Sequence, residues 1–191
     1  FGHLFRAQGL EGELAEQQQR YGRAVEAVYG YADRILGDFL AALEIDKVNI
    51  VGNSFGSRVA QCFTIHYPQR VIKLAMTGTG AGPKDMPAEE KARIITTREG
   101  RMAKGIYGFG ARVAALLGPN PSPELVTEVQ RILRATQPRG FMHGVKLGTF
   151  NGYSPEEVGA AATMPVLLIQ GRHDRVNSGD KNAAVLIKFL K

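Results

Sequence analysis

The stretch NIVGNSFGSRV joins an apolar run to an amphipathic segment through three small residues, Gly52, Ser54 and Gly56. The run Val48–Val51 is short, apolar and rich in β-branched residues, so it predicts a buried strand. The segment after Gly56 repeats apolar residues at helical spacing and predicts a helix that stops at Pro68. The chain must therefore turn sharply from a strand into a helix, and this turn limits the folds open to it.

The turn has the Gly-x-Ser-x-Gly spacing of a nucleophile elbow, which presents a serine above the edge of a sheet. The residues two positions before and after the serine are expected to be small, because larger side chains would collide with the adjoining strand and helix. The hydroxyl of Ser54 is then a candidate nucleophile, and the backbone N–H of Phe55 a candidate oxyanion-hole donor. The alternative is an incidental turn made of small residues, which the flanking strand and helix disfavour.

A carboxylate that suits this chemistry lies late in the chain. A serine nucleophile needs a histidine base, and the histidine needs a carboxylate to orient it. The stretch PVLLIQGRHDRV predicts a strand followed by a turn that carries Asp174, the expected acid. Two alternatives stay open: Asp174 pairs with Arg172 or Arg175 as an ordinary turn residue, or Asp180 takes its role.

The order of the predicted elements indicates an α/β fold. An amphipathic helix from Tyr31 precedes the first strand, and RVIKLAMTG after the elbow helix predicts a second strand. Helices and strands that alternate with short connections predict a mostly parallel sheet flanked by helices.

The middle of the chain has a different character, with glycine and proline frequent from Thr79 onward. Helices are predicted at 88–104 and 123–136, whereas the glycine-rich segment 138–154 is expected to be irregular. The expected organisation is a first part of the core, a helical insertion, and a second part of the core with a final helix, at residues 1–79, 80–162 and 163–191.

These blocks resemble the α/β-hydrolase family over most of Tyr31–Leu190. The wording GNSFG with GRHDRV is most similar to the carbon–carbon bond hydrolases that act on ring-cleavage products, and it is close to related esterases and lactonases. The resemblance implies a serine-dependent hydrolase of small carbonyl substrates, with the insertion as its cap and with neither metal nor organic cofactor. One departure is Ser57, where the family usually has a second glycine.

The resemblance also implies parts that are not found in this sequence. The family's catalytic histidine follows another strand, so we expect it beyond Lys191. FGHLF at the start corresponds to the family's glycine- and histidine-bearing loop. The four histidines, His3, His66, His143 and His173, are each poor candidates for the base. The alternative function is a non-catalytic fragment or pseudo-hydrolase that binds a ligand or a partner.

Other residues are candidates for substrate binding. Asn53 lies in the elbow, and Arg139, Phe141 and His143 lie in the insertion. Arg139 and Lys146 suit a substrate carboxylate, and an aromatic side chain suits an apolar pocket. Solvated charge and ordinary packing are the alternatives for these residues.

Composition narrows the partners. The net charge of +6 comes without a dense basic run or interleaved aromatics, which disfavours nucleic-acid binding. No apolar run approaches a membrane span, and no metal-ligand spacing is present. A single cysteine, Cys62, favours a reducing compartment, the cytoplasm. A small-molecule substrate is expected, and a homo-oligomer stays open.

Overall fold

The computed structural model describes residues 33–103, 110–150 and 153–191. Predictions for residues 1–32, including the loop at FGHLF, lie outside the described residues. The sheet contains β1 (Val48–Asn53), β2 (Val71–Thr77) and β3 (Val166–Ile169), in that spatial order. Both strand pairs are parallel, as the alternation of helices and strands predicts.

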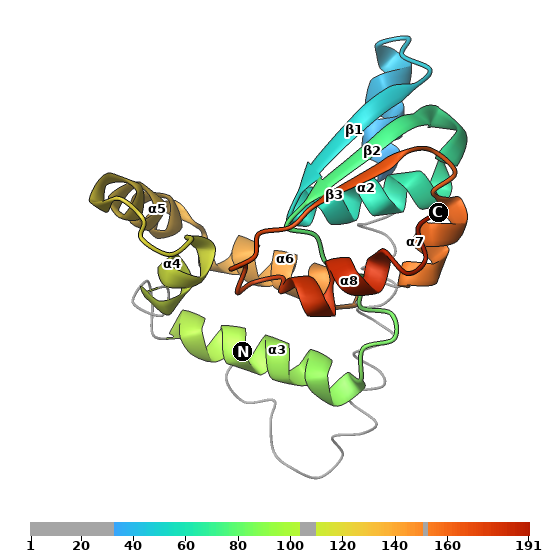
Figure 1. Ribbon diagram of the computed structural model, residues 1–191. Coiled ribbons are helices and arrows are strands. Elements are labelled where there is room, and N and C mark those ends of the chain that lie inside the picture. The colour runs from blue at the N-terminus through green and yellow to red at the C-terminus, as the bar shows by residue number, and fades with distance from the viewer. Residues whose placement is uncertain (1–32, 104–109, 151–152) are drawn as a thin grey trace.

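One face of the sheet carries the core. Ile50, Leu74 and Val166 pair in register across the three strands, and they pack with the helix α2 (Phe55–His66), which covers this face (Figure 1). Phe63 of α2 and Leu74 are fully or almost fully buried there. The strands therefore form because their β-branched and apolar side chains remove area from water against α2 and the other helices that contribute to this core.

The other face of the sheet is open among the described residues. Val51, Ala75 and Leu167 pair in register on this face, and Val51 and Leu167 are 78% and 56% exposed. Ile169, one pair further along on the same face, is also exposed. Parallel sheets in α/β proteins are normally covered on both faces, so this apolar surface is unusual for a sheet of this kind.

The helix before the sheet spans residues 33–42 and is less buried than its apolar stripe suggests. Leu40 is buried and Leu36 packs against the core, whereas Ile35, Phe39 and Leu43 are exposed. Only the Leu36 and Leu40 side of this apolar surface of the helix therefore packs against the core.

Four helices make up most of the insertion: α3 (Ala88–Ala103), α4 (Gly110–Leu116), α5 (Pro123–Ala135) and α6 (Pro138–Phe150). They lie beyond the carboxyl ends of the strands (Figure 1). The helices predicted at 88–104 and 123–136 are confirmed as α3 and α5.

The expectation of an irregular segment at 138–154 is wrong for most of its length. Each glycine in a helix costs about 1 kcal/mol relative to alanine, which is why the segment reads as irregular. Pro138 suits the first helical position, and α6 packs along α3. Lys146 of α6 also forms an ion pair with Glu99 of α3 at 3.1 Å. Tertiary contacts therefore outweigh the low helix propensity.

The helix α7 (Pro155–Ala161) packs on the core rather than on the other insertion helices. Ser154 and Glu157 form a reciprocal capping box at its start, and Val158 is fully buried in the core cluster. Lys84 pairs with Glu157, and this hydrogen bond lowers the pKa of the Glu157 carboxyl. The pair ties the loop after β2 to α7, and Tyr153, just before α7, also belongs to the buried core cluster.

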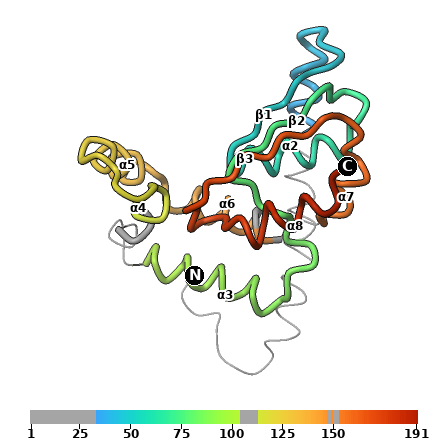
Figure 2. Tube along the Cα trace, in the orientation of Figure 1, coloured from blue at the N-terminus to red at the C-terminus, as the bar shows by residue number. Residues whose placement is uncertain are grey.

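The C-terminal segment runs beside α7 (Figure 2). After α8 (Ala183–Leu186), the chain passes so close to Gly159 that a Cβ built there would lie 2.3 Å from the carbonyl oxygen of Phe189. Gly159→Ala is therefore expected to lower the free energy of unfolding by about 2–3 kcal/mol through overpacking.

Thermal or urea unfolding of the variant protein measures this loss. Gly144→Ala in α6 is the matched control, because a Cβ there meets no atom of the described residues within 4 Å. It should stabilise the helix by up to about 1 kcal/mol. Equal effects of the two substitutions would contradict the close packing of the C-terminal segment on α7.

Among the described residues, no helix combines the length and the apolar character that crossing a bilayer requires.

Candidate active site

Ser54 lies between β1 and α2 in a backbone conformation that L-residues rarely adopt. Its φ is 51° and its ψ is −110°, and the residue is exposed. Its N–H donates to the carbonyl of Thr77 at 2.9 Å, which fixes the turn to the end of β2. A non-glycine residue with positive φ is strained, and such strain concentrates at functional sites.

The two glycines of the turn differ in their surroundings. A Cβ on Gly52 would lie 2.6 Å from both the carbonyl oxygen of Gly56 and the Cα of Ser57. A Cβ on Gly56 would meet no described atom within 4 Å. The expected collision is therefore present for a Cβ at Gly52 and absent for a Cβ at Gly56.

The carboxylate of Asp174 is held by the loop that follows β3. Its Oδ1 accepts hydrogen bonds from the backbone N–H groups of Val176 and Asn177, both at 2.8 Å. Its Oδ2 accepts a hydrogen bond from Nε2 of Gln170 at 2.9 Å. The described residues show no ion pair of Asp174 with Arg172 or Arg175, the alternative considered for this turn.

Ser54 and Asp174 lie at the same edge of the sheet, on either side of Gly78. Gly78 follows β2 with a φ of 53°, and its N–H donates to the carbonyl of Ile169 at the end of β3. A Cβ on Gly78 would lie 3.5 Å from Oδ2 of Asp174 and 3.9 Å from Oδ1 of Asn53, the neighbour of Ser54. The carboxyl ends of the three parallel strands thus bring the hydroxyl and the carboxylate to one rim.

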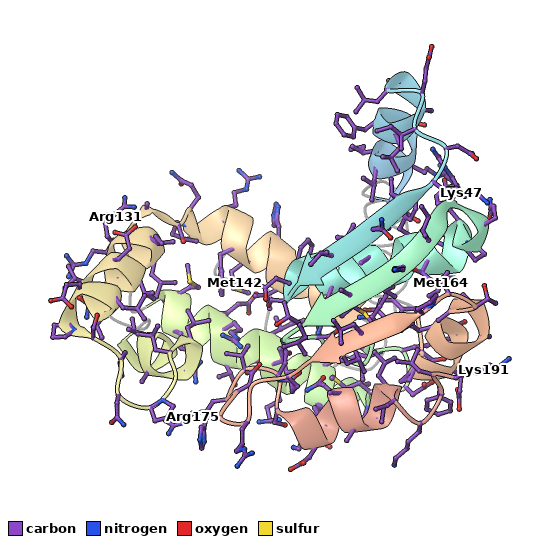
Figure 3. The ribbon with its side chains drawn as sticks, turned by 45° about the horizontal axis from the view of Figure 1, so that its top comes forward. Lys47, Arg131, Met142, Met164, Arg175 and Lys191 are labelled. Atoms are coloured by element: carbon purple, nitrogen blue, oxygen red, sulfur yellow. The ribbon has the colours of Figure 1, made fainter. Side chains whose placement is uncertain are left out.

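Figure 3 shows the polarity of this arrangement. Lys47, just before β1, and Arg175, just after the acid-bearing turn, lie at opposite ends of the sheet. Open α/β sheets bind their ligands at the carboxyl ends of the strands, which is the end where Ser54 and Asp174 lie.

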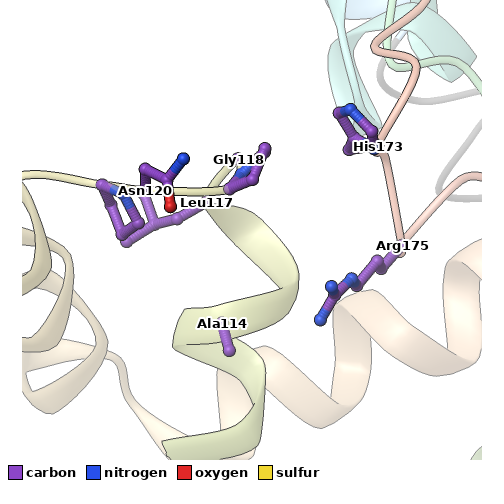
Figure 4. A pocket seen from close by; sticks show the side chains of 8 residues that line it. Ala114, Leu117, Gly118, Asn120, His173 and Arg175 are labelled. Atoms are coloured by element: carbon purple, nitrogen blue, oxygen red, sulfur yellow. The ribbon is translucent and has the colours of Figure 1, made fainter.

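A cavity of about 250 Å³ lies between α4 with its following loop and the loop after β3 (Figure 4). Leu117 and Pro119 line it from the insertion, and His173 and Arg175 line it from the other side. Asn120, with a φ of 62°, also lines it. The sequence predicts His173 only as a poor candidate for the base, and it does not predict the cavity, which depends on how distant segments pack.

The predicted catalytic residues Ser54, Phe55 and Asp174 are not among the residues that line this cavity, and the predicted substrate-binding residues also lie apart from it. Asn53 is exposed at the rim near Asp174, whereas Arg139, Phe141 and His143 lie on α6 and are not among the residues that line the cavity. Lys146 pairs with Glu99, which favours the structural alternative. His66, the last residue of α2, contacts the buried carboxylate of Asp33 through Nδ1.

Comparisons with known proteins agree with this architecture. The model of a family described as the alpha/beta hydrolase fold matches residues 22–190. A 2-hydroxy-6-oxononadienedioate/2-hydroxy-6-oxononatrienedioate hydrolase of Pseudomonas putida is 41% identical over 49 residues, which cover 26% of this chain and 17% of that protein.

Solved structures share the fold at low sequence identity. A hydrolase from Pseudomonas aeruginosa is 22% identical, with a TM-score of 0.64, over 83% of this chain and 58% of that one. A 2-hydroxy-6-oxo-6-phenylhexa-2,4-dienoate hydrolase from Rhodococcus sp. strain RHA1 is 23% identical, with a TM-score of 0.61, over 87% and 61%.

The matched regions are only part of these relatives. The P. putida match spans less than a fifth of that protein, and the structural matches span about three fifths of theirs. The family model nevertheless covers most of this sequence, and it coincides with a parallel sheet that carries a strained serine turn. The chain belongs to the α/β-hydrolase family.

Proposed function

We propose that the protein is a serine hydrolase in which the hydroxyl of Ser54 attacks the carbonyl carbon of a small substrate. The observation that carries this proposal is the position of Ser54, on a strained turn at the sheet edge that also holds Asp174. Phe55 supplies an oxyanion donor through its backbone N–H, since it directly follows the nucleophile in the turn.

The proposed cycle moves one proton through an imidazole. The imidazole takes the proton of Ser54 as the Oγ–C bond forms, and the negative charge develops on the carbonyl oxygen beside Phe55. The protonated imidazole then gives this proton to the leaving group, and an acyl-enzyme remains. Water, activated by the same imidazole, releases the acid and restores the serine hydroxyl.

The carboxylate of Asp174 would orient this imidazole. Three donors already fix its position, from Gln170, Val176 and Asn177. Such a carboxylate holds the imidazole in the correct tautomer and stabilises its protonated form. The described histidines do not suit the role. His66 contacts Asp33 at the far end of α2, and His143 lies on α6. His173, the neighbour of Asp174 in sequence, lines the cavity beside the loop after α4. We propose that the base comes from outside the described residues.

We also propose that α3 to α6 form a cap that covers the site and selects the substrate. These helices lie beyond the carboxyl ends of the strands, and the cavity lies where the loop after α4 meets the loop after β3 (Figures 1 and 4). Several relatives are named as hydrolases of 2-hydroxy-6-oxo-dienoates. The proposed substrates are therefore small carbonyl compounds: a vinylogous diketone cleaved at a carbon–carbon bond, a carboxylic ester or a lactone.

A fluorophosphonate probe tests this function. Incubation of the full-length protein with the probe should give a covalent adduct, and peptide mass spectrometry should locate it at Ser54. Ser54→Ala should remove the adduct, whereas Thr127→Ala, which alters an exposed hydroxyl on α5, should not. An unlabelled protein that also lacks esterase activity would favour the alternative, a non-catalytic module that binds a ligand or partner.

A further inference from the structure

Three polar side chains form a buried cluster beneath the serine turn. Ser57 and Gln61 of α2 are fully buried, and Thr79, in the loop after β2, is almost fully buried. The hydroxyl oxygens of Ser57 and Thr79 are 2.9 Å apart, and Nε2 of Gln61 lies 2.8 Å from Oγ1 of Thr79. Burying polar groups lowers the free energy of unfolding unless they form hydrogen bonds, so the bonds within this cluster are needed to keep it buried.

The hydrogen bonds of this cluster link α2 to the loop after β2. Nε2 of Gln61 also lies within hydrogen-bond distance of the carbonyl oxygens of Ser57 and Gly80, at 3.2 and 3.1 Å, which identifies it as the amide nitrogen. The hydroxyl of Ser57 lies 2.6 Å from the carbonyl oxygen of Ser54, which can only accept. The short contact assigns the single proton of Ser57 to the carbonyl of Ser54. The hydroxyl of Thr79 lies within hydrogen-bond distance of both Oγ of Ser57 and the carbonyl oxygen of Gly80, at 2.9 and 3.2 Å.

The cluster therefore contacts the carbonyl of the proposed nucleophile, Ser54, through the hydroxyl of Ser57. This oxygen accepts from Oγ of Ser57 at 2.6 Å and from the backbone N–H of Ser57 at 3.1 Å. The C=O of Ser54 and the N–H of Phe55 belong to one planar peptide group, in which they point in opposite directions. Holding the carbonyl toward the first turn of α2 consequently holds the N–H of Phe55 away from it.

We propose that Ser57 is a positioning residue that fixes the orientation of the Phe55 N–H through this peptide group. The inference rests on the proposed function, in which that N–H stabilises the oxyanion. The turn needs such a restraint because Ser54 has a strained backbone, with a φ of 51°. A second glycine at this position, usual in the family, could not supply the hydroxyl, so the restraint belongs to this sequence.

The test compares Ser57→Ala with Ser57→Gly in the full-length protein. Both remove the hydroxyl, and the second also removes the Cβ. The hydrolysis of p-nitrophenyl butyrate gives kcat and KM, and an aliphatic trifluoromethyl ketone, which forms a tetrahedral adduct with a serine, gives an inhibition constant. Loss of an oxyanion donor costs about 100- to 1,000-fold in kcat, so its misorientation should cost about tenfold.

A change in KM of less than about twofold should accompany this loss, because the oxyanion forms only in the transition state. The trifluoromethyl ketone should bind about tenfold more weakly, in step with kcat. Thr79→Val should lower kcat in the same direction, since it removes the hydroxyl that contacts Oγ of Ser57, and Thr79→Ser should restore it. If Ser57→Ala fails to fold, the Thr79 pair carries the test.

Two results would overturn the inference separately. If Ser54 reacts with a fluorophosphonate but Ser57→Ala lowers only the thermal stability, with kcat and inhibitor affinity unchanged, Ser57 is merely structural. If Ser54 in the native sequence shows neither labelling nor ester turnover, the proposed function fails, and the positioning role fails with it.

Discussion

Replacing Ser54 with alanine is expected to lower kcat for ester hydrolysis by about 10⁴- to 10⁶-fold, the range seen when a triad serine is removed. The hydroxyl is the proposed nucleophile, and no other described hydroxyl occupies the strained turn between β1 and α2. Initial rates of p-nitrophenyl ester hydrolysis at saturating substrate concentration measure this loss in kcat. Because Ser54 is exposed, the substitution should leave the unfolding temperature almost unaltered.

Thr127→Ala serves as the control for this measurement, since its hydroxyl bonds only within α5, to the carbonyl of Pro123. That variant should retain full kcat. Retention of more than a tenth of the native rate by Ser54→Ala would show that catalysis does not pass through this serine, and the assignment of the elbow would have to be abandoned.

Gly52→Ala should be the most damaging of the small substitutions in the core, with a loss of more than about 3 kcal/mol in the free energy of unfolding. The new Cβ would lie 2.6 Å from the carbonyl oxygen of Gly56 and from the Cα of Ser57, both backbone atoms of the first turn of α2. Neither can move without opening the turn, so the helix would separate from the strand. Urea denaturation followed by circular dichroism measures this loss.

Gly56→Ala provides the matched comparison, because Gly56 lies two residues after Ser54 just as Gly52 lies two residues before it. A Cβ there meets no described atom within 4 Å. It lies in the first turn of α2, where alanine is the better helix former, so stability should change by less than about 1 kcal/mol. Comparable destabilisation by the two variants would mean that the turn is not packed as described.

The sequence predicts the parts of this molecule that depend on local pattern. The strand before Gly52, the helix after Ser54 and the strand before Asp174 all follow from runs of apolar residues and the turn residues between them. The parallel arrangement then brings Ser54 and Asp174 to one edge, because the carboxyl ends of parallel strands meet there.

What the sequence does not predict depends on contacts between distant segments. The helix α6 forms although its glycines favour a loop, because it packs along α3. The cavity beside His173 requires the loop after α4 to approach the loop after β3. Ser57 reads only as a tolerated small residue, since its bonding to Thr79, 22 residues away, cannot be inferred from spacing.

The sheet face opposite α2, which no described helix covers, affects how the protein behaves in solution. This face presents an apolar surface to solvent, formed by Val51, Leu167 and Ile169. The outer strands of the described sheet are β1 and β3, and the backbone groups on their outer edges pair with no described strand. If this face stays exposed, the protein should bind hydrophobic dyes and self-associate. A segment that pairs with the outer strands and packs apolar helices on this face would prevent both.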